Sequence, residues 1–179
     1  MAAPHSYGWI SESALGDAAC VTVIVGSPAN EVLARFGADS SRTMAAADGD
    51  APGGSVAVVG VPGGVLAVEF NGFQGSLGEV IQRLSTDGLA ASMFWNVNDD
   101  NAFSCARDGQ LIASVDMYDA EDGDEIDLPE ELRDLFELAA DEDADLHAVG
   151  VAMVERFTGV AVPEDAIASI TVAHPVPNA

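Results

Sequence analysis

The chain has 179 residues, of which 49% are hydrophobic, and its 30 acidic residues against six arginines and no lysine give a formal net charge of −24. This length and apolar content predict one globular domain over residues 1–179. The excess of negative charge argues against direct binding of nucleic acid or of an anionic membrane surface, because both need clustered cations. The sequence has no long apolar run and no basic stretch preceding an apolar one at its start, so we expect neither a membrane span nor a secretory signal, and a cytoplasmic location.

The first predicted elements are a strand and a helix. The β-branched run over residues 19–25 is typical of a strand. After it, Ser27 and Pro28 predict the start of a helix, which Gly37 ends. The buried face of this helix is expected to hold Ala29, Val32, Leu33 and Phe36. The following stretch, residues 38–54, is rich in Ser, Ala, Asp and Gly and predicts a loop.

A hairpin and a second helix form the centre of the chain. Residues 55–59 and 65–70 predict paired strands, because a Pro-Gly-Gly turn separates them. Ser76 and Glu79 match a capping box at the start of a helix, and Gly88 predicts a left-handed turn at its end. The apolar residues at helical spacing are Leu77, Val80, Ile81 and Leu84.

Strand-like segments follow this helix over residues 88–95, 101–107 and 110–116. The last two predict a second hairpin, because Asp108-Gly109 between them is a pair that favours type I′ turns.

Half of the acidic residues lie in one block, residues 116–145, which holds fifteen of the 30 acids and one arginine, Arg133. The apolar residues inside this block that keep helical spacing are Leu128, Leu132, Leu135, Phe136 and Ala139. A further helix over residues 144–157 is predicted to end at Gly159. We therefore expect an α+β fold, with an antiparallel sheet of five or six strands, helices mainly on one face and a C-terminal acidic helical pair.

Several short motifs resemble an uncharacterised domain family of actinobacterial proteins. The most specific are Asn71-Gly-Phe-Gln-Gly75 and Phe94-Trp-Asn-Val-Asn98. Further matching pieces are Tyr7-Gly-Trp9, Cys20-Val-Thr22, Phe103-Ser104, Asp108-Gly109 and Phe157-Thr-Gly-Val160. The resemblance covers most of the chain, but the family brings no established activity, so it implies no catalytic role. The acidic block is where the sequence departs most from the family pattern.

No motif for catalysis or cofactor binding is present: the sequence lacks a Walker loop, a dinucleotide-binding glycine motif, a nucleophile elbow, His-Glu-x-x-His and Cys-x-x-Cys. We therefore predict no cofactor and no metal, and we favour a non-enzymatic function. The turn at residues 98–101 offers oxygen ligands but lacks the glycine and glutamate of an EF-hand. His147 has no second His or Cys nearby and is expected on a helix surface. Cys20 and Cys105 are expected to be buried thiols.

The best candidate for a small-ligand or catalytic site is the turn at residues 69–74. The residues assigned to it are Glu69, Asn71, Phe73, Gln74, Trp95 and Asn96. Amides beside aromatic rings suit a small molecule or a peptide. A structural alternative remains open, in which Asn71 and Gln74 satisfy backbone groups of the loop while Phe73 and Trp95 belong to the core.

The acidic block suggests a partner. The acids predicted to share one exposed face are Glu130, Glu131, Asp134, Glu137, Asp141 and Glu142. On a continuous helix they would span about 18 Å, at ~1.5 Å per residue. Our first hypothesis is a cytoplasmic protein-binding module whose acidic surface attracts a basic partner. Two alternatives are a DNA mimic that occupies the cationic groove of a nucleic-acid-binding protein, and a surface that only solubilises the chain.

Overall fold

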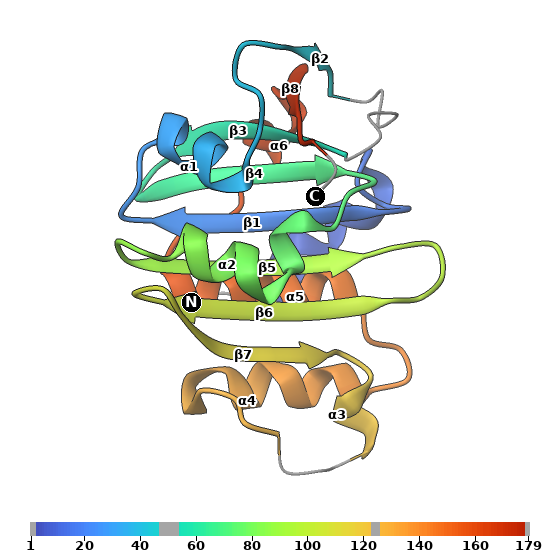
Figure 1. Cartoon of the computed structure of the whole chain (residues 1–179). Coiled ribbons are helices and arrows are strands. Elements are labelled where there is room, and N and C mark those ends of the chain that lie inside the picture. The colour runs from blue at the N-terminus through green and yellow to red at the C-terminus, as the bar shows by residue number, and fades with distance from the viewer. Residues whose placement is uncertain (1–2, 47–53, 123–125, 178–179) are drawn as a thin grey trace.

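The computed structural model describes residues 3–46, 54–122 and 126–177, and its centre is one antiparallel β-sheet (Figure 1). Eight strands hydrogen-bond in the order β2-β8-β3-β4-β1-β5-β6-β7, and every neighbouring pair is antiparallel. The strands, in chain order, are β1 (Ala19–Val25), β2 (Met44–Ala45), β3 (Ser55–Val61), β4 (Gly64–Phe70), β5 (Leu89–Trp95), β6 (Asn101–Arg107), β7 (Gln110–Asp116) and β8 (Val172–Pro175). The predicted α+β class with one antiparallel sheet is confirmed.

The predicted number of strands, five or six, is wrong because two short strands extend the sheet. β2 has two residues and β8 has four, and together they add an edge beyond β3. β2 arises within the stretch predicted to be a loop, of which residues 47–53 lie outside the described part of the chain. Strands this short leave no readable alternation of apolar and polar residues, so only their pairing in space identifies them.

Helices cover both faces of the sheet, whereas the sequence predicted that they would lie mainly on one (Figure 1). The helical segments, in chain order, are η1 (Pro4–Glu12), α1 (Ala29–Phe36), η2 (Gln74–Ser76), α2 (Gly78–Leu84), α3 (Asp119–Asp122), α4 (Glu130–Phe136), η3 (Glu137–Ala140), α5 (Leu146–Thr158) and α6 (Glu164–Ala168). α1 and α2 pack on one face, while α5 crosses the other with η1 and α4 against it. The central strand β1 is buried at six of its seven positions, as expected of a strand covered on both faces.

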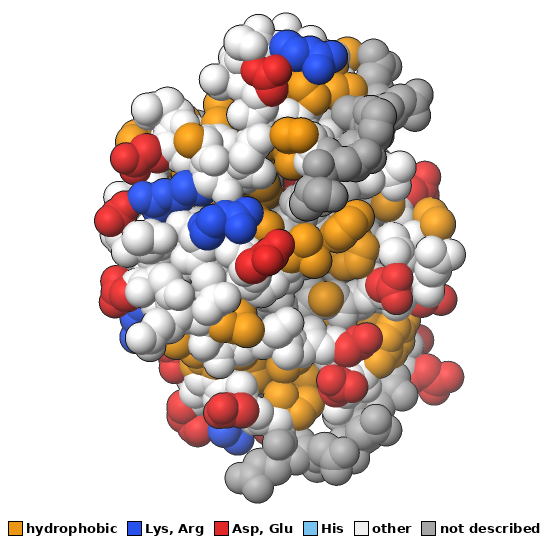
Figure 2. Space-filling model, viewed as in Figure 1, with side chains coloured by type: hydrophobic (Ala, Val, Ile, Leu, Met, Phe, Trp, Pro, Cys, Tyr) orange, Lys and Arg blue, Asp and Glu red, His pale blue; other side chains and the backbone are white. Residues whose placement is uncertain are grey.

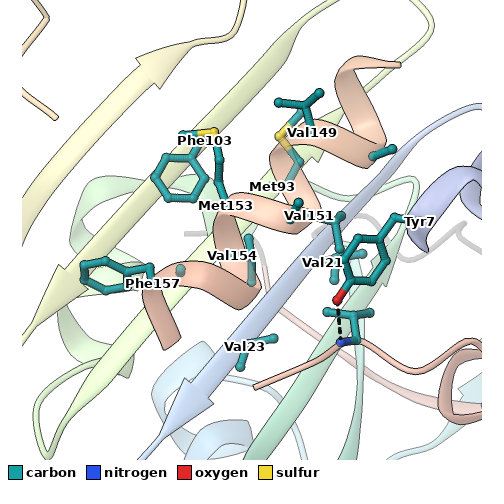
Figure 3. Close-up of a cluster of buried hydrophobic side chains, with 14 of the residues drawn as sticks. Tyr7, Val21, Val23, Met93, Phe103, Val149, Val151, Met153, Val154 and Phe157 are labelled. Atoms are coloured by element: carbon teal, nitrogen blue, oxygen red, sulfur yellow. Dashed lines mark hydrogen bonds between the residues drawn. The ribbon is translucent and has the colours of Figure 1, made fainter. Parts of the chain in front are cut away.

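α5 is buried on nearly every side, which fixes its position on the sheet. Figure 3 shows Val149 and Met153 of α5 among side chains from the strands, including Met93 and Phe103, in one hydrophobic cluster. The outer side of α5 is covered by η1 and α4, and every residue over 148–154 is buried. α5 has 13 residues, and none of the helices described here has the length and apolar character needed to cross a bilayer.

The start and end of α2 differ from the prediction. Ser76 belongs to η2, and its hydroxyl donates to the Phe73 carbonyl, so the predicted capping box is not formed. α2 ends at its cap residue Ser85, and Gly88 is therefore not its terminus. Gly88 instead allows a close approach to the Val25 carbonyl, where an added Cβ would clash.

The two predicted hairpins are confirmed. β3 and β4 pair around a two-residue turn at Pro62 and Gly63, and β6 and β7 pair around Asp108 and Gly109. Asp108 and Gly109 both have positive φ, as a type I′ turn requires. The first predicted strand is confirmed, and so is the end of the first helix at Gly37. The predicted start of that helix is wrong by one residue: its N-cap is Pro28, and the Ser27 hydroxyl accepts a hydrogen bond from Arg35 instead of capping the helix.

Candidate functional site

An open hollow of about 480 Å³ lies where the β5–β6 turn meets the segment that enters α5. Its acidic lining residues are Asp99, Asp141, Glu142, Asp143 and Asp145. Its other polar and aromatic lining residues are Ser11, Asn101, Tyr118 and His147. We refer to the space that these residues line as the acidic hollow. Its walls come from parts of the chain that are far apart in sequence.

The wall nearest α5 is shaped by its own acidic residues. Asp145 is the N-cap of α5: its Oδ1 accepts a hydrogen bond from the Ala148 amide at 3.1 Å, and its Oδ2 accepts from the Ser11 hydroxyl at 3.3 Å. Asp141 Oδ1 accepts from the Asp143 amide at 3.0 Å. An aspartate directly before an apolar helix is a common helix start, so this wall follows from local sequence.

The opposite wall is the β5–β6 turn, which Asn96 organises. Asn96 Oδ1 accepts from the amides of Asn98, at 2.8 Å, and Asp100, at 3.2 Å, while its Nδ2 donates to the Asp100 carboxylate. Asp99 has a φ of 65° in this turn and lines the hollow. Asn96, predicted to contact a ligand, therefore bonds to its own turn.

The floor of the hollow is His147, whose ring stacks on the buried ring of Trp95. The centroids of the His147 imidazole and the Trp95 indole are 4.7 Å apart, with 18° between the planes. Trp95 is fully buried and its Nε1 donates to the Leu15 carbonyl at 2.7 Å, so the indole is held from below. Burial lowers the pKa of His147 below its ordinary value of 6.5, although nearby Asp145 opposes the shift. His147 is thus mostly uncharged at pH 7. It lies on α5 as predicted, but it is half-buried because one face of its ring packs on Trp95.

Asn101 lies beside this stack. It pairs with Trp95 in the β5–β6 register, so the two side chains share one face of the sheet. Its Nδ2 donates to the Asp99 carbonyl at 3.0 Å, but its buried Oδ1 accepts no hydrogen bond from any residue that the structure describes. Buried polar atoms without a partner are uncommon in folded proteins. This oxygen has no exposed surface, although the Asn101 residue lines the hollow.

The acidic hollow has no positive side chain to balance its five carboxylates, since none of its described lining residues is Lys or Arg. Arg133 and Arg156 form ion pairs elsewhere, with Glu130 and Asp134 of α4. Figure 2 shows basic side chains over α1 and α2, and acidic side chains along the right-hand margin, where the β5–β6 turn and the entry to α5 lie in Figure 1. Across residues 3–46, 54–122 and 126–177, no three His, Cys, Asp or Glu side chains are placed to hold a metal ion.

The six acids of the predicted acidic face are all exposed, but they do not lie along one helix. α4 ends at Phe136, so Glu137 falls in η3, and Asp141 and Glu142 fall in the acidic hollow. The predicted row of carboxylates along one straight helix is therefore wrong. The regular spacing of apolar residues continues from the α-helix into a 3-10 helix, and for that reason it did not reveal the break.

Glu69, predicted to contact a ligand, is buried and holds the turn at residues 71–75 together. Its Oε1 accepts from the Gln74 amide at 2.8 Å, and its Oε2 accepts from the Gly75 amide at 2.7 Å. Burial raises the pKa of Glu69 to about 7, although these two amides favour the ionised form. Gly72 also lies against this side chain, because an added Cβ would be 2.8 Å from the Glu69 Cβ.

The residues predicted around this turn do not face a common ligand. Phe73 is 49% exposed and packs edge-to-face on Phe94, with 6.3 Å between ring centroids. Trp95 lies on the opposite face of the sheet, in the cluster with α5, because successive residues of a strand alternate between faces. Asn71 has a left-handed conformation and its amide donates to the Ala18 carbonyl. Asn71 and Trp95 thus have structural roles, while Phe73 is an exposed aromatic side chain.

Sequence reasoning missed the acidic hollow as a site, although it identified pieces of it. Three parts of it were singled out in the sequence as separate features: residues 98–101, His147 and the acidic block. The contact between His147 and Trp95 joins α5 to β5, and no short motif spans it. The one local sign was Asp145, whose position before an apolar helical run is that of an N-cap.

Comparison with known proteins relates the whole chain to one family. A family model described as a family of unknown function (DUF6461) matches residues 1–174. The chain belongs to this family. Its resemblance to an uncharacterised domain family is thereby confirmed. No curated protein and no solved structure matches the chain.

Proposed function

We propose that this DUF6461 protein is a non-enzymatic, cytoplasmic binding module that holds a basic segment of a protein partner in the acidic hollow. The observation that carries the proposal is the uncompensated charge: five carboxylates line the hollow, and its described lining residues include no Lys or Arg. Such a surface attracts and orients a basic partner during encounter, and it rejects acidic ones.

Exposed apolar side chains around the hollow support a protein partner rather than a small ion. Val97 in the β5–β6 turn is 75% exposed, Leu138 on η3 is 47% exposed, and Tyr118 is 41% exposed. Leu138 lines a neighbouring hollow of about 280 Å³. Three acidic residues, Asp141, Asp143 and Asp145, line both this hollow and the acidic hollow. Aromatic and aliphatic anchors next to charged groups are typical of protein interfaces.

The geometry gives little support to catalysis in the hollow. Ser11 and His147 both line it, but the Ser11 hydroxyl donates to Asp145 rather than to the imidazole. A nucleophile needs a hydrogen bond to its general base, and the described residues form no such pair here.

Peptide binding to two charge-matched variants tests the proposal. The hollow variant carries Asp141→Asn, Glu142→Gln and Asp143→Asn. The α4 control carries Glu130→Gln and Glu131→Gln in α4 and Glu137→Gln at the start of η3, which removes the same amount of charge from outside the hollow. The probe is a short fluorescent peptide that alternates arginine and glycine, and fluorescence anisotropy at low salt gives its affinity.

We expect the hollow variant to weaken binding by at least about 10-fold and the α4 control by less than about 3-fold. Equal losses in the two variants would mean that the peptide responds only to net charge, and the proposal would then be wrong. A larger loss in the α4 control, with competition by duplex DNA, would favour the DNA-mimic alternative instead.

A further inference from the structure

The floor of the acidic hollow restricts which cation suits it. We infer that the basic partner places one arginine side chain in the hollow, with the guanidinium plane against the His147 ring and one N–H donated to Asn101 Oδ1. This inference rests on the proposed function and adds the identity of the side chain that is recognised.

His147 offers a flat surface with little charge. One side of its ring lies on Trp95, 4.7 Å away between centroids and 18° from parallel, and His147 also lines the hollow. Because burial lowers the pKa of His147, the ring carries little positive charge at pH 7 that would repel a cation. A guanidinium group stacks on such a ring while its N–H groups remain free to donate at the edge.

Asn101 offers an acceptor that lacks a donor. Its side chain lies on the same sheet face as Trp95, it lines the hollow, and the residue is only 4% exposed. Its Oδ1 has no hydrogen-bond partner in the described chain, while its Nδ2 bonds to the Asp99 carbonyl. Oδ1 has no exposed surface in the structure, so donation from an arginine requires the amide to rotate about its soft terminal torsion when the donor enters the hollow.

The carboxylates surround the hollow instead of converging on one point. Asp99 comes from the β5–β6 turn, whereas Asp141 and Asp145 come from the wall that enters α5. No three acidic, His or Cys side chains of the described ranges are placed to bind a metal ion. A lysine ammonium is a compact charge with three donors, but a guanidinium spreads five donors over a plane. The wider group can donate to acceptors that come from more than one side of the hollow.

Three matched peptides test the inference, with the central basic residue as arginine, lysine or citrulline, the uncharged analogue of arginine. On the wild type, we expect lysine to bind about 5-fold to 10-fold more weakly than arginine, and citrulline more than about 10-fold more weakly. His147→Phe keeps a flat ring and should keep the preference for arginine over lysine. Two further variants, His147→Ala and Asn101→Leu, which has a similar side-chain volume, should lose the preference. In both, the ratio of the affinities for the arginine and lysine peptides should be close to one.

The ratio of the affinities of one protein for the arginine and lysine peptides separates recognition of arginine from general damage to the fold. Partial unfolding lowers both affinities equally and leaves their ratio unchanged. A wild type that binds arginine and lysine peptides equally would overturn the inference. So would a His147→Ala protein that keeps the full preference for arginine. In both cases the proposed function stands if the hollow variant still loses binding, and it fails separately if that variant binds like the wild type.

Discussion

Glu69 explains the spacing of residues in Asn71-Gly-Phe-Gln-Gly75, one of the motifs that resemble the family. The residue is 1% exposed, and the turn at residues 71–75 folds back so that two of its amides reach the carboxyl group. Side chains at Gly72 and Gly75 would not fit against the groups that surround it. The sequence predicted a loop here, but it could not show that the loop amides bind a carboxyl group inside the fold.

Stability should depend on pH through Glu69. Its pKa is about 7 in the folded protein against an ordinary 4.5, so the folded state retains a proton that the unfolded chain loses between these values. The free energy of unfolding therefore falls as pH rises from about 4.5 to about 7, by roughly 3 kcal/mol for this group, and then levels off. Glu69→Gln should remove this contribution, so it destabilises more at about pH 5 than at about pH 8.

Denaturant titrations at the two pH values measure this difference, with the exposed Glu79→Gln as the control. Because the control retains Glu69, it should follow the wild type at both values. The same pH dependence in the wild type and in Glu69→Gln would contradict a raised pKa for Glu69.

A methyl group at Gly75 should destabilise the protein. The added Cβ would lie 3.1 Å from both Cys20 Sγ and Glu69 Oε2 and would overlap the Thr22 hydroxyl. Overpacking of a buried site costs about 1–3 kcal/mol, so Gly75→Ala should lower the melting temperature, and Thr22→Ala in the same chain should restore part of it. Gly8→Ala is the control, since no atom lies within 4 Å of its Cβ. A Gly75→Ala protein as stable as this control would refute the close approach.

At the scale of elements, α4 and η3 combine a buried side with a surface beside the acidic hollow. Leu132 of α4 is fully buried, whereas Leu138 of η3 is 47% exposed. Leu132→Ala should cost about 2–5 kcal/mol of stability, as expected for a cavity in a core. Leu138→Ala should change stability by less than about 1 kcal/mol but should weaken binding of the basic peptide.

Thermal melts and anisotropy on the same two proteins test this separation. If Leu138→Ala binds the peptide like the wild type, the apolar rim is not part of the interface.

Elements with strong local patterns were predictable. β1 has the predicted bounds because its β-branched run is continuous, and Asp108-Gly109 turned the second hairpin as expected. Residues 170–172 were strand-like in sequence, but β8 begins only at Val172, and its place in the sheet follows from pairing with β2 and β3. The sequence also could not show which face of the sheet each helix covers. Strands buried on both faces have no alternation of apolar and polar residues that would distinguish the two faces.

The candidate site was predictable only in part. Asp141 and Glu142 were assigned to an acidic surface, and the structure shows them exposed on the hollow. The floor was not predicted, because the stack of Trp95 on His147 depends on how α5 crosses the sheet. The excess of acidic residues can be read from the sequence. The hollow itself cannot, because its walls and floor come together only through tertiary contacts.

For the whole molecule, the net charge of −24 should act on folding and on binding in opposite directions. Raising salt from about 20 mM to about 500 mM shortens the screening length from roughly 20 Å to roughly 4 Å. Self-repulsion of the folded protein then weakens, so the melting temperature should rise, while the affinity for a basic peptide should fall. Melts and anisotropy in the same buffers measure both effects. An affinity that does not change with salt would mean that apolar contacts, not charges, drive binding.

The central claim is that the acidic hollow is the surface that binds a basic partner, and mapping of backbone amide chemical shifts tests it most directly. The measurement titrates the peptide of alternating arginine and glycine into isotope-labelled protein at low salt. The account predicts that the largest shifts fall in residues 96–101, at Tyr118 and in residues 141–147, with small shifts in α4 and in residues 71–75. Largest shifts in α4 or in residues 71–75, or no shifts at high peptide concentration, would contradict it.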